Sequence, residues 1–194
     1  MEKDAVKCVV IGGSAGSLQI ILHILSGLNQ NFQIPLIIVM HRKNEPKSNL
    51  VEVLASRAKT PVKEAEDKER IEPGLIYLAP ADYHLLVEND HSLSLDVSEK
   101  IHYSRPGIDA TFQTAADAYG RGLITILLSG ANADGTDGLK QVRLKGGTTI
   151  VQQPDDAQVP YMPQSAIDQS LADHILSKEG IVKMLNSVAG KKGL

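Results

Sequence analysis

The chain has 194 residues, a formal net charge of −3 at pH 7 and 42% hydrophobic residues. This length suits one domain with a substantial core, and the mixed charges exclude a dedicated nucleic-acid binder, which would carry a basic stripe. The single cysteine, Cys8, excludes an intrachain disulfide. Neither a signal peptide nor a membrane-length apolar stretch is recognisable, so the sequence predicts a cytoplasmic protein without membrane insertion. The short basic segments at residues 41–47 and 190–194 are expected to be a solvated loop and tail.

Short apolar runs alternate along the chain with segments of helical periodicity. Residues 6–13 and 34–40 are almost entirely apolar, which is typical of strands buried on both faces. Between them, leucine and isoleucine recur every three or four residues and predict an amphipathic helix. Further strands are predicted at residues 61–65, 75–80, 122–130 and 148–153, a β-hairpin at 83–97, and further helices at 50–54, 108–119, 136–146, 163–169 and 179–190.

This order of elements predicts an α/β fold. We expect a doubly wound, mainly parallel sheet with helices on both faces and one antiparallel β-hairpin. In such folds, ligands bind beyond the carboxyl ends of the strands, at a switch in strand order. Candidate functional residues are therefore sought where the buried strands end.

A serine, a histidine and an aspartate each follow a predicted buried strand. Ser14 lies in a glycine-rich turn after the first strand, His41 follows the second, and Asp134 lies in the loop after the strand that begins at Gly122. A neutral imidazole can take the proton of a serine hydroxyl, and a carboxylate on its other ring nitrogen fixes the tautomer. The three residues are therefore candidates for a catalytic triad.

Each of these signals also has a simpler interpretation. The glycine-rich turn could bind a phosphate on main-chain N–H groups, although its glycines match neither the G-x-G-x-x-G nor the P-loop spacing. Asp137 is a rival carboxylate that could instead serve the N-terminus of the following helix. The other five histidines are expected to be capping or surface residues: His23, His84, His91, His102 and His174.

An ordered set of motifs resembles the catalytic domain of the CheB family, the chemotaxis protein-glutamate methylesterases. The motifs extend over about residues 6–185 and are VVIGGSAGSLQIILHIL, IIVMHR, AEDKERIEPGLIYLAPADYHLLV, SRPGIDATFQTAADAYG, ITILLSGANADGTDGL and QQPDDAQVPYMPQSAI. The resemblance implies hydrolysis of glutamyl γ-methyl esters on the cytoplasmic helices of chemoreceptors, with release of methanol. It also implies that deamidation of receptor glutamines is possible.

The same resemblance implies a role for each matching residue. Ser14 corresponds to the nucleophile, His41 to the base and Asp134 to the residue that orients the base. No metal or organic cofactor is implied. Main-chain N–H groups at Ala15 and near Ala131 are expected to hold the oxyanion.

Two arginines near the predicted strand ends, Arg42 and Arg105, are candidates for binding the acidic face of a receptor helix. The alternative, that both are ordinary surface arginines, is equally compatible with the sequence.

Several residues depart from the family pattern. Ala15 stands in place of threonine, Ala131 and Asn132 in place of methionine and glycine, and Tyr161 in place of the glycine of Gly-Met-Pro. These departures motivate an alternative function, that of a non-catalytic or altered-specificity member acting as a signalling or binding module. Residues 1–194 are expected to form a single methylesterase-like catalytic domain without a receiver domain, either as a stand-alone member or as a piece of a longer protein.

Overall fold

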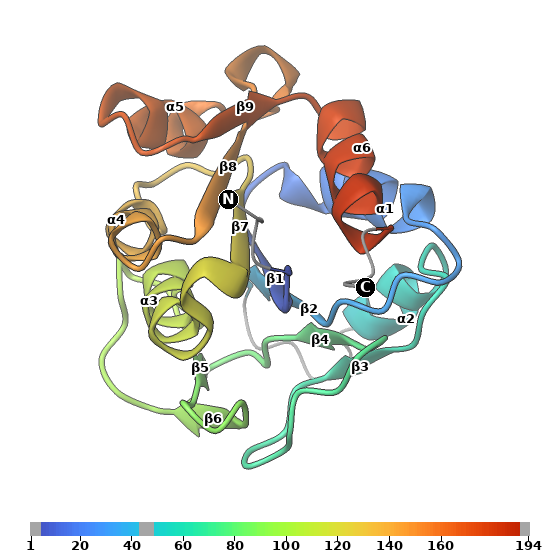
Figure 1. Ribbon diagram of the computed structural model, residues 1–194. Helices are drawn as coiled ribbons and strands as arrows, with labels where there is room; N and C mark the ends of the chain where they lie inside the picture. Colours follow the sequence, from blue (N-terminus) through green and yellow to red (C-terminus); the bar gives the residue numbers. More distant parts are fainter. Residues whose placement is uncertain (1–4, 43–48, 191–194) are drawn as a thin grey trace.

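The computed structural model describes residues 5–42 and 49–190 and is built around a seven-stranded sheet (Figure 1). The strand order is β3-β4-β2-β1-β7-β8-β9, and all neighbouring strands are parallel. The predicted doubly wound parallel sheet is thus confirmed. Its strands are β1 (Cys8–Gly13), β2 (Leu36–Met40), β3 (Val62–Glu64), β4 (Ile76–Leu78), β7 (Leu123–Leu127), β8 (Thr148–Gln152) and β9 (His174–Leu176).

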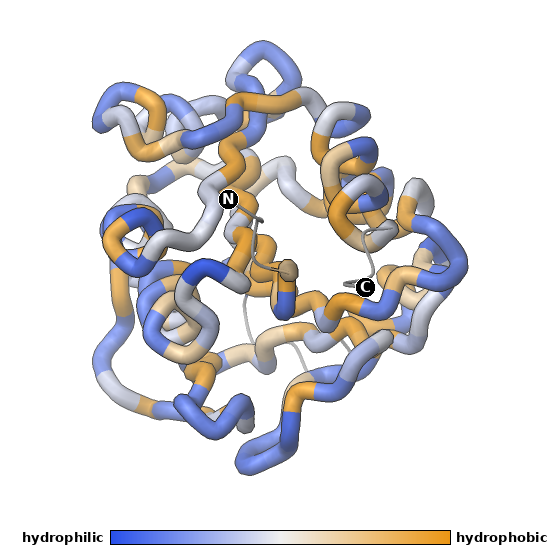
Figure 2. Tube along the Cα trace, in the orientation of Figure 1, coloured by the Kyte–Doolittle hydropathy of each residue, from blue (hydrophilic) through white to orange (hydrophobic). Residues whose placement is uncertain are grey.

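The central strands are buried on both faces. Cys8 and Val10 of β1 enter one hydrophobic core, whereas Val9 and Ile11 enter the other. This alternation follows from the two-residue period of a strand, in which successive side chains point to opposite faces. Figure 2 shows the strands as an apolar centre surrounded by more hydrophilic segments. The uninterrupted apolar runs of the sequence therefore serve two cores at once.

Helices cover both faces of the sheet (Figure 1). Phe112, Leu139 and Met162 bring one set of helices into the first core, and Ile21 and Ile181 bring the other set into the second. The first set is α3 (Ile108–Tyr119), α4 (Thr136–Leu144) and α5 (Tyr161–Asp168), and the second is α1 (Ser17–Gly27), α2 (Leu50–Ala55) and α6 (Lys178–Ala189). Short 3₁₀ helices span Gly120–Gly122 and Pro154–Asp156.

The predicted hairpin forms a separate antiparallel pair, β5 (His84–Val87) and β6 (Leu93–Asp96). It is held against α3 by two threonines. The Thr111 hydroxyl donates to the Leu85 carbonyl at 2.7 Å, and the Val87 N–H donates to the Thr114 hydroxyl at 3.1 Å. The hairpin therefore supports the helix whose N-terminus reaches the candidate site.

The sequence analysis missed the edge strand β9, besides the two short 3₁₀ helices. Two of its three residues, His174 and Ile175, are exposed, so the segment is no buried apolar run. Its strand character comes from pairing with β8, with Val151 opposite Ile175. Short edge strands of this kind depend on a neighbour and leave little pattern in the sequence.

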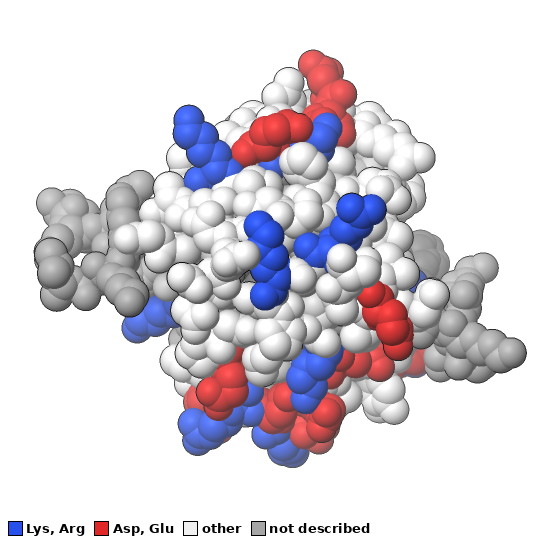
Figure 3. Space-filling model, turned by 90° about the vertical axis from the view of Figure 1, so that its right-hand side faces the viewer, with Lys and Arg blue, Asp and Glu red and all other residues white. Residues whose placement is uncertain are grey.

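Charges of both signs are distributed over the surface. On the face drawn in Figure 3, basic side chains stand singly across the middle, and acidic and basic side chains mix along the lower edge. The basic segments at 41–47 and 190–194 lie mostly outside the described residues. Within the described ranges, no helix is long and apolar enough to cross a membrane.

Candidate active site

The ends of β1, β2 and β7 bring three loops together. Gly13 pairs with Met40, so Ser14 and His41 leave the sheet side by side, and the His41 N–H donates to the Gly13 carbonyl at 3.2 Å. On the other side of β1, the Ser14 N–H donates to the carbonyl of Ser129 at 2.9 Å. The chain passes from one side of β1 to the other at this point, which is the switch in strand order where ligands bind in such sheets.

The glycines around Ser14 are required by close packing and by one turn. A Cβ atom on Gly12 would lie 2.4 Å from Cγ2 of Ile108, so a side chain there would push the start of α3 away from β1. Gly16 has φ +80°, a left-handed conformation that favours glycine, and its Cβ would lie 2.6 Å from Cβ of Gln158. The glycines thus allow Ser14 to stand between two loops that approach closely.

His41 and Asp134 form a direct pair next to Ser14. The distance from His41 Nε2 to Asp134 Oδ2 is 2.6 Å, and the Asp134 side chain is fully buried. An ionised carboxylate only accepts hydrogen bonds, so the imidazole proton lies on Nε2 and the lone pair on Nδ1. The two ring nitrogens are therefore used in the opposite sense to the chymotrypsin-like triad, in which Nδ1 faces the carboxylate.

Asp134 is held by main-chain donors in addition to His41. Its Oδ2 atom accepts the Ile108 N–H at 2.7 Å, and its Oδ1 atom accepts the N–H groups of Asp109 and Gly135, each at 2.9 Å. Ile108 and Asp109 begin α3, whose first N–H groups have no partner within the helix and favour a negative charge.

Burial by itself would raise the pKa of the Asp134 carboxyl. The hydrogen bonds from His41 and from the first two residues of α3 outweigh that effect and hold the pKa below its ordinary value. Asp134 is therefore a stable carboxylate at neutral pH.

Two further polar residues brace the serine turn, and the sequence analysis did not single them out. The Ser129 hydroxyl lies 2.7 Å from the Ala15 carbonyl and accepts the Val159 N–H at 2.9 Å. The Ser129 N–H donates to the Gln152 side chain at 2.9 Å. The sequence signal that could have pointed to Ser129 is its place after the strand β7. Its partners, however, come from distant segments.

His84 is not a surface residue, because its side chain is buried, and of the two expected roles its contacts resemble the capping one. Its Nδ1 atom accepts the N–H of Gly107, the residue before α3, at 2.9 Å, and its Nε2 atom donates to the Glu99 carbonyl at 2.9 Å. His84 therefore helps to position the N-terminus of α3. His102 is partly exposed, as expected, but it lies 3.5 Å from the buried carboxyl group of Asp109.

The two main-chain groups expected to hold an oxyanion remain available. In the part of the chain that the structure describes, the N–H groups of Ala15 and Ala131 donate to no protein acceptor, and both residues are exposed. By contrast, the Ser14 N–H is engaged by the Ser129 carbonyl.

The two candidate arginines both make hydrogen bonds within the protein. Arg42 pairs with Glu64 and donates to the Ala79 carbonyl at 3.2 Å. Arg105 donates to the carbonyls of Val97 and Ser98, at 2.7 and 2.8 Å. The bonds of Arg42 thus join the end of β2 to the ends of β3 and β4, and those of Arg105 lie within the segment between β6 and α3.

A groove of about 640 Å³ lies along α5, beside the site. Val159, the partner of Ser129, forms part of its wall, and Tyr161 lines it with 60% of its surface exposed. Asp155 and Asp168 make the lining acidic. One departure from the family pattern, Tyr161, thus lines this groove.

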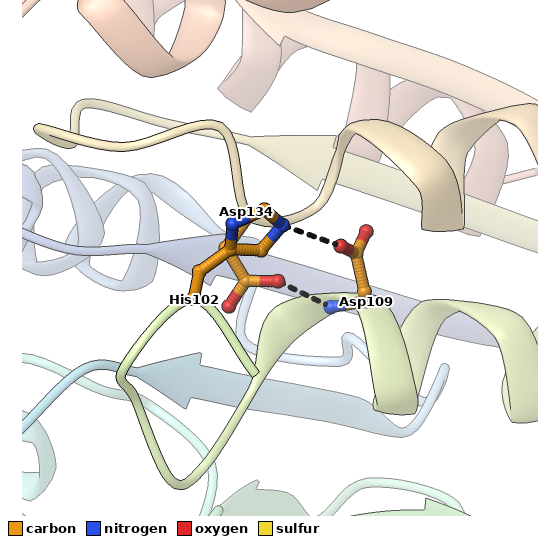
Figure 4. A group of neighbouring side chains, drawn as sticks. All are labelled: His102, Asp109 and Asp134. Carbon is orange, nitrogen blue, oxygen red and sulfur yellow. Dashed lines mark hydrogen bonds and ion pairs between the residues drawn. The ribbon is translucent and has the colours of Figure 1, made fainter. Parts of the chain in front are cut away.

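One group of side chains has the composition of a metal site. The nearest ligand atoms of His102, Asp109 and Asp134 all lie within 4.8 Å of one another (Figure 4). However, each oxygen of Asp134 already accepts two hydrogen bonds, so its lone pairs are occupied. The group is better described as a network of hydrogen bonds and charges.

Comparisons with known proteins agree with this architecture. The family model for CheB methylesterase matches residues 9–185. A Leptospira interrogans protein, assigned by name to protein-glutamate methylesterase and protein-glutamine glutaminase activity, is 40% identical over 178 residues, 92% of each chain. The protein-glutamate methylesterase/protein-glutamine glutaminase of Thermotoga maritima is 37% identical over 173 residues, which are 88% of this chain and 50% of that protein.

A solved structure is similar over almost its whole length. The crystal structure of the catalytic domain of the Thermotoga maritima CheB methylesterase has a TM-score of 0.90 and 35% sequence identity, and the match covers 95% of this chain and 99% of that one. The fold and these relatives define a hydrolase built on a doubly wound parallel α/β sheet. The chain belongs to the CheB methylesterase family, as the sequence motifs predicted.

Proposed function

We propose that this protein hydrolyses glutamyl γ-methyl esters on the cytoplasmic helices of chemoreceptors, with Ser14, His41 and Asp134 as its catalytic triad. The observation that carries the proposal is the 2.6 Å bond between His41 Nε2 and Asp134 Oδ2 beside the end of β1. This bond directs the Nδ1 lone pair of a neutral imidazole away from the carboxylate, where it can serve Ser14 as a base.

The reaction proceeds in two steps through a covalent intermediate. Ser14 Oγ attacks the ester carbonyl carbon while His41 Nδ1 accepts the hydroxyl proton. The oxyanion is held by the N–H groups of Ala15 and Ala131. The C–O bond to the methoxy group then breaks, and methanol leaves with the proton from His41. Water, activated by His41, hydrolyses the glutamyl–serine ester and restores a glutamate side chain and the free Ser14.

Glutamine deamidation requires the same groups. With an amide substrate, ammonia leaves in place of methanol, and the intermediate is identical. The double names of the Leptospira and Thermotoga relatives support this pair of reactions. Because Asp134 is already held by four donors, no rearrangement of the acid is needed in either reaction.

Release of methanol from methylated receptor membranes tests this proposal. Wild type should release methanol, and Ser14→Ala should lower the rate by about 10⁴-fold or more, since removal of a triad nucleophile eliminates covalent catalysis. Ser26→Ala is the matched control, because Ser26 is an exposed serine whose hydroxyl bonds within α1, to the His23 carbonyl. Its rate should equal that of wild type.

Labelling with a serine-directed phosphonate gives a second readout. Wild type and Ser26→Ala should be labelled, and Ser14→Ala should not. If wild type releases no more methanol than Ser14→Ala, the esterase proposal is wrong for this substrate. Labelling at Ser14 would then indicate an altered specificity, and absence of labelling would favour a binding module.

A further inference from the structure

A second buried carboxyl group, that of Asp109, lies directly behind the acid of the candidate triad. Asp109 is in the first turn of α3, and its side chain is only 6% exposed. Its main-chain N–H donates to Asp134 Oδ1 at 2.9 Å, and its own Oδ1 accepts the Gly138 N–H at 2.7 Å. Figure 4 shows the two carboxyl groups from α3 and from the loop after β7, with His102 approaching from a third segment.

Two carboxyl groups at this separation and burial do not both ionise readily, because like charges repel strongly in a poorly solvated site. Asp134 accepts four hydrogen bonds and keeps the negative charge. Asp109 accepts one main-chain bond, so it is the group that holds a proton. Consistent with this division, burial and then the charge of Asp134 raise the pKa of Asp109 to about 7, against the effect of the Gly138 bond.

Other charged groups face Asp109 from the surrounding elements. His102 Nε2 lies 3.5 Å from Asp109 Oδ2, and His102 is partly exposed, which gives the pair access to solvent. Asp137, in the first turn of α4, adds a negative charge on the exposed side. His41 lies across Asp134.

We propose that Asp109 and His102 form a positioning pair that sets the charge behind Asp134 and thereby the pH range in which His41 accepts the Ser14 proton. The consequence for catalysis rests on the proposed function. With Asp109 protonated, the negative charge that pairs with His41 is that of Asp134. When Asp109 loses its proton to solvent, a second negative charge stabilises the imidazolium form of His41, and a higher pH is then needed to make His41 a base.

The titration of Asp109 itself tests the first half of the proposal without any substrate. In the full-length protein, the ¹³Cγ signal that is lost in Asp109→Asn should titrate near pH 7. In His102→Gln its midpoint should move upward, because a polar partner that favours the ionised carboxyl group, the His102 ring 3.5 Å away, has been removed. A midpoint near the ordinary aspartate value, or no effect of His102→Gln, would overturn the pair.

The pH dependence of Ser14 labelling by a serine-directed phosphonate tests the second half. Asp109→Asn retains an oxygen acceptor for the Gly138 N–H but has no charge. Its rising limb should move to lower pH by about 0.5–1 unit, and that of His102→Gln should move less in the same direction. Asp117→Asn is the matched control, since Asp117 is exposed and paired with Lys145 at the far end of α3, and its limb should not move.

A purely structural role for Asp109 predicts a different result. The labelling rate of Asp109→Asn would then be lowered by the same factor at every pH, and the rising limb of its pH profile would stay in place. That result would overturn the proposal, provided that thermal melting shows Asp109→Asn to be folded. Neither readout requires the methyl ester. Failure of ester hydrolysis with an intact Asp109 titration would therefore count against the proposed function alone.

Discussion

The two ends of the candidate site differ in how many hydrogen bonds hold their functional groups. At the acid end, Asp134 is fully buried and accepts three main-chain N–H bonds and one bond from His41. At the nucleophile end, Ser14 is half-buried, and the N–H groups of Ala15 and Ala131 have no acceptor within the described part of the protein. In the proposed mechanism, the acid is thus oriented before substrate binds, whereas the two free N–H groups are left for the substrate.

The departures from the family pattern lie at both ends. Ala15 and Ala131 belong to the nucleophile end, where only main-chain groups are required and a change of side chain leaves the N–H in place. Tyr161 lines the neighbouring groove. At the acid end, the Oδ1 atom of Asn132, another departure, accepts the Asp134 N–H at 3.1 Å.

The largest expected effect comes from altering the acid end. Asp134→Asn places an amide N–H₂ or oxygen where the carboxylate accepted four bonds, and it cannot hold His41 in the tautomer with a free Nδ1 lone pair. We expect kcat for ester hydrolysis to fall by about 10⁴-fold, as in other triads with this change. Asp134→Ala should also lower the free energy of unfolding, by about 1–3 kcal/mol for each buried N–H left unpaired.

Denaturant unfolding and methanol release on the same samples would check both variants. If Asp134→Asn retained more than a tenth of the wild-type rate, the acid end would not orient the base, and the comparison between the two ends would fail.

An intermediate effect is expected from the hydrogen bonds that support the nucleophile end. Ser129→Ala removes the hydroxyl that joins the Ala15 carbonyl to the Val159 N–H. We expect a loss of about 1–2 kcal/mol in stability and about a tenfold lower kcat, because the oxyanion donor at Ala15 is less well positioned. The matched control is Ser56→Ala, since Ser56 is an exposed serine that bonds the Val53 carbonyl within its own helix turn.

Steady-state kinetics with a glutamyl γ-methyl ester peptide would separate kcat from KM. A Ser129→Ala variant that was destabilised but kept the wild-type kcat would limit Ser129 to the fold.

A last expected effect is a change in how stability depends on pH. Asp109 has a pKa of about 7 in the folded protein against an ordinary value of 3.8, so the folded state binds the proton more tightly between these values. The free energy of unfolding should therefore fall as pH rises from about 4 to 7. Asp109→Asn should lack this decline, and thermal melting of both proteins at several pH values would show it.

The contribution of Asp134 to stability changes with pH in the opposite direction. Its pKa lies below the ordinary value, so its contribution is present above about pH 4 and is lost as pH falls further. Both wild type and Asp109→Asn should therefore lose stability in acid. Parallel melting curves between pH 4 and 7 would contradict the shifted titration of Asp109.

Several elements could be predicted from the sequence because their signals are local. The uninterrupted apolar strands β1, β2 and β7 have a clear pattern, and parallel neighbours necessarily end at the same edge of the sheet. Ser14, His41 and Asp134 could therefore be grouped before their geometry was known. The edge strand β9 could not, because its strand character depends on β8.

The supporting residues could not be predicted in the same way. Asp109 reads as an ordinary acidic residue at a helix N-terminus, and His84 as an ordinary polar residue at a strand end. Their roles arise from contacts between distant segments, such as His84 with Gly107 and Asp109 with Gly138. No local pattern records which partner such a side chain will meet.

The amino-acid sequence by itself determined the α/β class, the order of strands and helices along the chain, the family, and the three residues of the candidate triad. These properties depend on periodicity, on glycine-rich turns and on motifs, all of which are local or ordered along the chain. The tertiary structure alone decided which imidazole nitrogen faces Asp134, which main-chain groups hold the acid, and that a second carboxyl group lies behind it. Hydrogen bonds and charge coupling depend on distances of a few ångströms, which are set only when the strands, loops and helix ends pack together.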